Sequence, residues 1–252
     1  YRGQRIYDLL DDRVASGDPI DAPFLERLGR DVRDGRAASI VDNLVFAARD
    51  DPDLADAAET LDAWDYRMTH DSEAALIFHH WVSHYREELL GEAFDDEGLD
   101  EGYYPQDGRL IELPPESDWF GPGGREQVML RALRAALAEI DEEGHDTYGD
   151  VAHTGLISHL TDLDFLGYPE FPRSGSGWTV RNYGIDGPWG GGWGMQGALD
   201  GEYRAILAGG NSGRYYSEHY DSQLERWADG EYRRLNREIG GSRTTEFVEG
   251  DR

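Results

Sequence analysis

The sequence predicts an α+β protein in which helices come first and strands follow. Repeated apolar stripes of helical period occupy residues 1–145, eleven glycines fall among residues 184–213, and one further helical stripe closes the chain. Helices and strands that are segregated along the sequence favour an α+β arrangement over alternating βαβ units. We expect a helical part over residues 1–145 and a strand-rich part with a C-terminal helix over residues 146–252, which completes the same domain.

Six amphipathic helices are expected in the helical part. The first carries Ile6, Leu9, Leu10 and Val14 on one face, the spacing of a helix that packs on one side. Because Tyr1 already lies at the start of this helix, with no methionine or signal peptide before it, we expect further residues upstream. The expected helices cover residues 2–14, 24–32, 37–49, 54–64 and 72–90, and the sixth follows the Gly-Pro-Gly-Gly break at 121–124.

The longest of these helices leads into an acidic run. Residues 87–101 contain eight acids and no cation. Such a run is typical of a solvated loop or a frayed helix end rather than of a metal site.

The strand-rich part combines glycines with aromatic and β-branched residues. Tight turns between short apolar segments predict strands over residues 178–182, 193–199 and 203–208. A final helix is expected over residues 220–236, where apolar residues return at helical spacing.

The charge of the chain excludes several classes of partner. There are 24 Lys+Arg, all of them arginine, against 52 Asp+Glu, for a net charge of −28. A surface this acidic repels nucleic acids and anionic membranes, and no apolar run approaches the ~20 residues of a membrane-spanning helix. At molar salt the Debye length falls to about 3 Å, so this self-repulsion is screened. We therefore hypothesise a halophilic source.

The absence of cysteine excludes a disulfide framework, a thiolate metal site and a cysteine nucleophile. His80 and His84 lie four residues apart on a helix and could face one zinc ion. However, Trp81 stands where a zincin motif requires glutamate, and His79 adds no clear third ligand. Neutral histidines beside a core face explain the cluster, and we expect no metal ligands in this chain.

Other candidate sites are weak. Ser212, His219 and Asp221 suggest a triad, but Arg214 replaces the last glycine of Gly-x-Ser-x-Gly, and the glycine-rich stretch lacks the P-loop lysine. Acid pairs could serve a glycosidase, and tryptophans could stack on sugars, yet nothing distinguishes these residues from surface and core. The acid pairs considered are Asp95 with Asp96 and Asp162 with Asp164.

Several motifs, in order, resemble the penicillin acylase family. The C-terminal part holds Gly-Gly-Asn-Ser-Gly, then Ser-Glu-His-Tyr-Asp-Ser-Gln-Leu, then Trp-Ala-Asp-Gly-Glu-Tyr, where the family has Gly-Gly-Gln-Ser-Gly, Ser-Pro-His-Tyr-Asp-Asp-Gln-Leu and Trp followed by Gly-Glu-Tyr. A Tyr-Arg-x-x-Arg-Ile element and a Leu-Asp-Ala-Trp-Asp segment precede them. A weaker match covers residues 176–182. The stronger matches lie at residues 1–6, 61–65, 72–75, 209–213, 217–224 and 227–232.

The resemblance implies an N-terminal nucleophile hydrolase with an αββα fold, of which this chain is the C-terminal part of the large chain. In that family a precursor cuts itself in two, and the new terminal serine attacks an amide with its own α-amino group as base. A backbone N–H and an asparagine amide form the oxyanion hole. The first residue here is Tyr1, so the nucleophile, the oxyanion asparagine and most calcium ligands are expected outside this chain.

Arg2 is the one active-site residue that the resemblance transfers to this sequence. It matches an arginine that supports the catalytic centre, and a permanent cation there favours the developing oxyanion. The alternative is a salt bridge along the first helix. Asn211 departs from the family's glutamine, and His219 is expected to fix the C-terminal turn through hydrogen bonds.

The resemblance implies part of an acylase that cleaves a linear acyl amide, such as a β-lactam side chain or an N-acyl homoserine lactone. Its expected partners are the small chain and the rest of the large chain, with no nucleic acid or membrane. It implies no cofactor in this chain, calcium only through residues outside it, and a site outside the cytoplasm. The alternatives are a non-catalytic scaffold or binding domain of the same fold and a carbohydrate-binding module.

Overall fold

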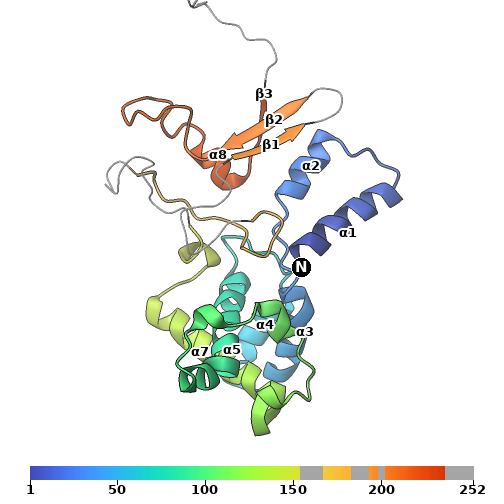
Figure 1. Ribbon diagram of the computed structural model, residues 1–252, viewed down its shortest axis with the longest axis vertical. Coiled ribbons are helices and arrows are strands. Elements are labelled where there is room, and N and C mark those ends of the chain that lie inside the picture. Colours follow the sequence, from blue (N-terminus) through green and yellow to red (C-terminus); the bar gives the residue numbers. More distant parts are fainter. Residues whose placement is uncertain (154–166, 183–192, 198–201, 236–252) are drawn as a thin grey trace, which may run out of the picture.

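The computed structural model describes residues 1–153, 167–182, 193–197 and 202–235. Helices dominate the first part of the chain, and three short strands follow, so the fold is α+β as the sequence predicts (Figure 1). The helices α1–α5 are Arg2–Ala15, Ala22–Gly29, Ala37–Ala48, Ala55–Asp62 and Glu73–Asp96. The later elements are η1 Glu101–Tyr103, α6 Asp107–Ile111, η2 Asp118–Gly123, α7 Gly124–Glu143, η3 Tyr148–Asp150, β1 Trp193–Gly197, β2 Tyr203–Leu207, α8 Leu224–Asp229 and β3 Arg233–Leu235.

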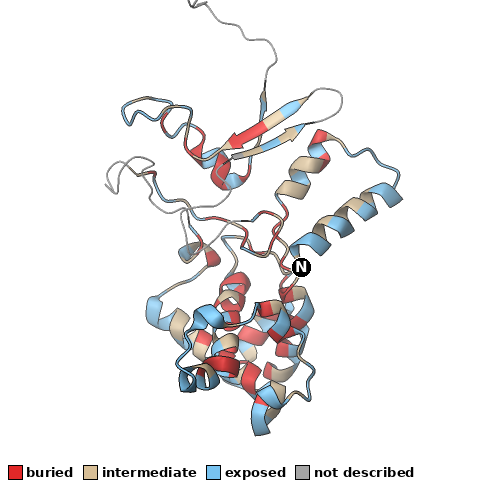
Figure 2. Ribbon diagram, viewed as in Figure 1, coloured by how far each residue is buried: buried red, intermediate tan, exposed pale blue. Residues whose placement is uncertain are grey.

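The main core lies between α3, α4, α5 and α7, which gather at one end of the molecule (Figure 1). Helix α5 begins after Ser72, whose hydroxyl caps it by accepting the N–H of Ala75. Its face buries Phe78, Trp81 and Tyr85, and the two large rings of Trp81 and Tyr85 stack 4.8 Å apart. Burial is concentrated in these helices, as Figure 2 shows.

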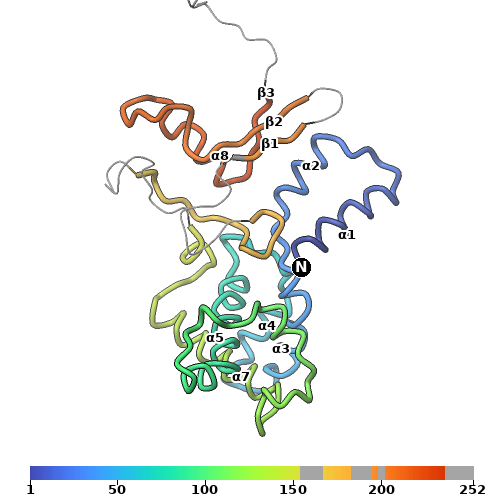
Figure 3. The backbone as a smooth tube through the Cα atoms, in the orientation of Figure 1, coloured from blue at the N-terminus to red at the C-terminus, as the bar shows by residue number. Residues whose placement is uncertain are grey.

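Helices α1 and α2 lie beside this core rather than inside it. No residue of α1 is buried, and Val14, the last member of the expected apolar stripe, is 66% exposed. Helix α2 begins at an Asp21 cap with Pro23 in its first turn, and it contacts β1. The chain therefore starts at the junction between the helical core and the sheet, where the N-terminus is marked in Figure 3.

The sheet is antiparallel, with strand order β1-β2-β3. Trp193 pairs with Leu207 across β1 and β2, and Tyr203 pairs with Leu235 across β2 and β3. A second apolar cluster, formed chiefly by α8 with Ile206 of β2, lies at this end of the molecule.

Two predicted elements differ from the structure. Residues 178–182 form a turn rather than a strand, closed by a single bridge between Ser176 and Asn182. The predicted final helix is only Leu224–Asp229, because Gly230 adopts a left-handed φ of +71° that ends it, and the chain continues as β3. The division at residue 145 stays a prediction. In the described part of the chain, no helix is long and apolar enough to cross a membrane.

Candidate functional site

The N-terminal residue is fixed against two glycines from other elements. A Cβ atom at Gly35 would lie 2.8 Å from Tyr1 Cβ, and one at Gly108 would lie 3.1 Å from Tyr1 Cε2. The Tyr1 hydroxyl donates a hydrogen bond of 3.2 Å to Glu112. A side chain at Gly35 would clash with Tyr1 and one at Gly108 would be tight, so the start of α1 is anchored to the segment before α3 and to α6.

Arg2 is the first residue of α1, and its side chain is exposed. Within the described residues it makes no hydrogen bond or ion pair, so the expected alternative of a salt bridge on this helix is not seen there. One turn later, Arg5 donates two hydrogen bonds of 3.2 and 2.8 Å to the buried Asp31. The base of α1 is thus held by Tyr1 and Arg5, while the Arg2 guanidinium remains available to another group.

A buried ionic network lies next to this anchor. Arg36 contacts Asp34 through Nε and Nη2, with the latter bond at 2.7 Å, and its Nη1 donates to Asp107. Asp34 is fully buried, and the ring of Trp178 lies 4.8 Å from the Arg36 guanidinium carbon. Arg86 approaches Asp107 at 3.4 Å. The network therefore joins α3, α5, α6 and the turn at 176–182.

Charge balance explains how this network is buried. Two aspartates face one buried and one partly exposed arginine, so the charges nearly cancel. Burial opposes the charged guanidinium, but Asp34 and Asp107 outweigh it and raise the pKa of Arg36. Sequence reasoning missed this network because Arg36 and Asp107 lie 71 residues apart.

The histidines of α5 meet a glutamate of α7. His80 Nδ1 lies 3.0 Å from Glu139 Oε2, and His84 Nε2 lies 2.7 Å from the same oxygen. Burial opposes ionisation of Glu139, but the hydrogen bonds from both histidines lower the pKa of its carboxyl. The spacing of His80 and His84 thus serves a shared carboxylate acceptor.

Ser212, His219 and Asp221 do not assemble into a triad. The Ser212 hydroxyl accepts the N–H of Arg214 at 3.1 Å, while the Ser212 N–H donates to the His219 carbonyl at 3.1 Å. The His219 side chain is 64% exposed. His219 therefore holds the C-terminal turn through a hydrogen bond to its backbone carbonyl, while its ring is exposed.

The glycine-rich turn at residues 209–213 packs tightly on this backbone. A Cβ atom at Gly210 would lie 2.0 Å from the His219 carbonyl oxygen. Asn211 accepts a 3.0 Å hydrogen bond from the Gln223 side chain. The two family-like motifs thus form one structural unit in which Asn211 makes a specific contact.

The remaining proposed acid pairs gain no support as sites. Asp95 and Asp96 end α5 on its exposed side, and Asp162 and Asp164 lie outside the described residues.

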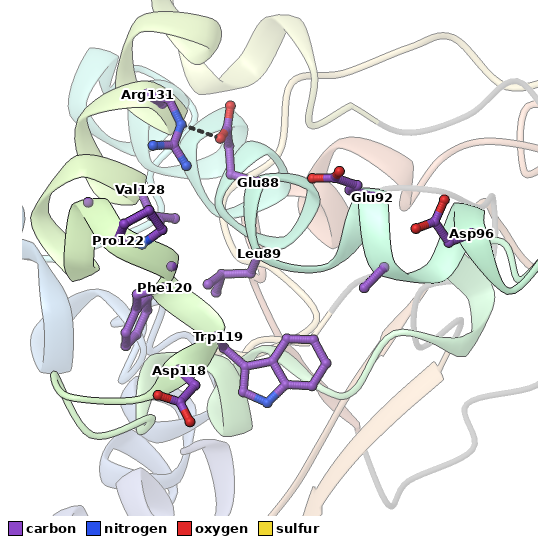
Figure 4. Close-up of a pocket in the computed structure, with 13 residues that line it drawn as sticks. Glu88, Leu89, Glu92, Asp96, Asp118, Trp119, Phe120, Pro122, Val128 and Arg131 are labelled. Carbon is purple, nitrogen blue, oxygen red and sulfur yellow. Dashed lines mark hydrogen bonds and ion pairs between the residues drawn. The ribbon is translucent and has the colours of Figure 1, made fainter.

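A cavity of about 590 Å³ lies between α5, η2 and α7, and Trp119 in its lining is half exposed. Figure 4 shows the residues that line it. Its charged lining contains four acids and Arg131, which pairs with Glu88 at 2.6 Å. This acidic lining disfavours a substrate that bears a carboxylate.

A groove with a mainly positively charged and apolar lining lies between α1 and α2. Its volume is about 430 Å³, and Leu9, Phe24 and Leu28 provide its apolar lining. Its charged lining is Arg27, Arg30, Arg67 and Asp31. In a chain of net charge −28, this local excess of arginine is the more favourable surface for an anionic group.

The chain is similar to known proteins in sequence and in fold. A sequence model of the family described as penicillin amidase matches residues 1–238, nearly the whole chain. The chain belongs to the penicillin amidase family. A thermostable penicillin G acylase from Alcaligenes faecalis in an orthorhombic crystal form has a similar structure, with a TM-score of 0.55 and 16% sequence identity. No curated protein matches the chain significantly.

The structural match spans nearly all of this chain but only part of the related chain. The match covers 98% of this chain but only 53% of the Alcaligenes faecalis chain. At 16% identity the likeness shows the fold: the helix-rich part and the three-stranded sheet correspond to part of a penicillin acylase. The family membership predicted from the motifs is therefore confirmed, and the role of Arg2 stays a prediction.

Proposed function

We propose that this chain is part of an amidohydrolase that cleaves a linear acyl amide, and that it supplies Arg2 to the catalytic centre. The family match over residues 1–238 is the observation that carries this proposal. Candidate substrates are a β-lactam side chain, an N-acyl homoserine lactone or a related acylated amine. The remaining parts of the acylase are its proposed partners.

The proposed reaction begins with a terminal serine that the 252 residues do not supply. Its hydroxyl oxygen attacks the amide carbonyl carbon, and its α-amino group accepts the hydroxyl proton. Collapse of the tetrahedral intermediate breaks the C–N bond, and the amine leaves with that proton. Water then hydrolyses the acyl ester and restores the serine.

Arg2 suits a supporting role because of how α1 is anchored. Tyr1 and Arg5 fix the helix start through contacts with Glu112 and Asp31, while Arg2 is exposed and has no partner in the described part of the chain. The anchored helix fixes the backbone of Arg2, and its guanidinium supplies a permanent positive charge. It stabilises negative charge on the carbonyl oxygen or orients the asparagine that does so.

The substitution Arg2→Ala in the assembled enzyme tests this role. We expect kcat/KM for a chromogenic phenylacetyl amide to fall roughly 10²–10³-fold, the loss typical of a missing oxyanion donor. The free energy of unfolding should change by less than about 0.5 kcal/mol, because the exposed side chain makes no contact to lose.

Arg49→Ala is the matched control, because it removes the same charge from an exposed helix end. It should leave kcat/KM unchanged. An unchanged kcat/KM in Arg2→Ala would remove Arg2 from the catalytic centre, and absence of hydrolysis in the unmodified enzyme would favour the scaffold alternative.

A further inference from the structure

The two ring nitrogens of His80 lie in different surroundings. His80 is 6% exposed, and its Nδ1 contacts Glu139 Oε2 at 3.0 Å. Its Nε2 is fully buried and has no hydrogen-bond partner among the residues that the structure describes. Because the carboxylate only accepts, Nδ1 carries a proton, and in the neutral imidazole Nε2 then presents a lone pair. A buried polar atom of this kind requires a partner.

Two further ligand groups come from the end of α7. Glu143 is the last residue of that helix, and His145 follows Gly144, whose left-handed φ of +67° turns the chain. The rings of His80 and His145 lie 6.3 Å apart. One ligand atom from each of His80, Glu143 and His145 lies within 4.8 Å of the other two.

The contact between Glu143 and His145 favours a shared metal ion over a direct hydrogen bond. His145 Nδ1 lies 3.0 Å from Glu143 Oε2, yet this nitrogen is buried and makes no acceptable hydrogen bond within the described residues. Two ligands bound to one tetrahedral ion at about 2.0–2.1 Å lie roughly 3.3 Å apart, which is close to this spacing. We propose that His80, Glu143 and His145 bind a zinc ion.

The donor set selects the class of ion. Two imidazole nitrogens and one carboxylate oxygen suit Zn²⁺ and its neighbours, whereas Ca²⁺ and Mg²⁺ require sites built mainly from oxygen. Three protein ligands leave a fourth position for water. From the sequence we considered His80 with His84 and expected no metal ligands; in the proposed site His145, not His84, is the second imidazole.

Glu139 gives the site an outer shell. It accepts from His80 Nδ1 and from His84 Nε2, at 3.0 and 2.7 Å. A carboxylate that holds a histidine in this way fixes its tautomer and raises its basicity toward the metal. The bound ion would tie the middle of α5 to the end of α7, and the site is independent of the acylase activity proposed above.

Zinc titration of the full assembled protein, after removal of metals with EDTA and in molar KCl, tests the site. Calorimetry should show one Zn²⁺ per chain, and Co²⁺ should give the visible absorption of a four-coordinate ion. An excess of Mg²⁺ or Ca²⁺ should displace neither the bound Zn²⁺ nor the bound Co²⁺. A hundredfold excess of Zn²⁺ over Kd should raise Tm measurably, by a smaller amount than in a single small domain.

Variants separate this site from general cation binding by an acidic surface. Glu143→Gln and His145→Gln should weaken zinc binding by more than about 100-fold, because even outer-shell losses such as Glu139→Gln cost about 10–100-fold. Glu142→Gln makes the same charge change at the neighbouring exposed position and should leave Kd unchanged. Absence of a stoichiometric site, or equal weakening by Glu142→Gln and Glu143→Gln, would overturn the proposal.

Discussion

At the scale of single residues, Arg36 is the cation of a buried ionic network. Its guanidinium neutralises Asp34 and Asp107, both of them buried. Replacing it with methionine keeps much of the volume but leaves the buried Asp34 without its cation and Asp107 with Arg86 alone. We expect Arg36→Met to lower the free energy of unfolding by about 3–5 kcal/mol, as measured by urea denaturation. The control Arg109→Met, at an exposed position, should change the free energy of unfolding by less than about 0.5 kcal/mol. A similarly small change in Arg36→Met would contradict a stabilising role for the buried network.

Asp150 provides a pH-dependent contribution at the same scale. Its carboxylate accepts the N–H groups of Thr147 at 2.8 Å and Asp146 at 2.9 Å, and these bonds lower the pKa of Asp150. A lowered folded-state pKa stabilises the protein above the unfolded value near 3.9, and this stability is lost as the pH falls through the folded value.

We therefore expect Asp150→Asn to be destabilising in urea at about pH 6 and much less so at about pH 3. Asp146→Asn, which removes a neighbouring exposed carboxylate, should show no such difference. A destabilisation by Asp150→Asn that is the same at both pH values would be evidence against this role.

At the scale of elements, the helical spacing of apolar residues located the six helices expected within residues 1–145, because each of them carries apolar residues at this spacing. It did not predict the end of α8, which depends on one backbone angle at Gly230. The turn at 178–182 was also predicted wrongly: the Thr179 hydroxyl donates to the Arg181 carbonyl at 2.6 Å and accepts the N–H of Ser176 at 2.9 Å, which closes a turn. The sequence alone indicates apolar helix faces well, but it indicates poorly which turns are closed by side-chain hydrogen bonds.

Gly230→Ala tests the end of α8. A side chain at φ +71° is strained, and its Cβ would lie 3.3 Å from Arg181 Cζ and Arg30 Cγ. We expect a loss of roughly 1–2 kcal/mol in the free energy of unfolding. Gly213→Ala is the control, since nothing lies within 4 Å of its Cβ position. Equal losses in both variants would contradict the assignment of the helix end.

The candidate site was predictable only in part. Tyr1 and Arg2 were found through a motif, but the close contacts of Tyr1 involve Gly35 and Gly108, which periodicity does not distinguish from other glycines. His80 was recognised as a possible ligand. Its partner His145 was not, because the two meet only when α7 packs on α5.

At the scale of the whole molecule, the net charge of −28 governs the response to salt. Repulsion between exposed acids destabilises the compact state in dilute buffer, and molar salt screens it. Thermal unfolding should therefore give a higher Tm in 2 M KCl than in dilute buffer. A higher Tm in dilute buffer would refute the hypothesis of adaptation to concentrated salt.

We propose above all that this chain is part of an acyl-amide hydrolase whose nucleophile is supplied by another part of the protein. The most direct measurement compares turnover of a chromogenic phenylacetyl amide and an N-acyl homoserine lactone by the assembled protein and by the 252-residue chain alone. We predict hydrolysis of at least one substrate by the assembled protein and none by the chain alone. Turnover by the chain alone, or inactivity of the assembled protein toward both acyl amides, would contradict the claim.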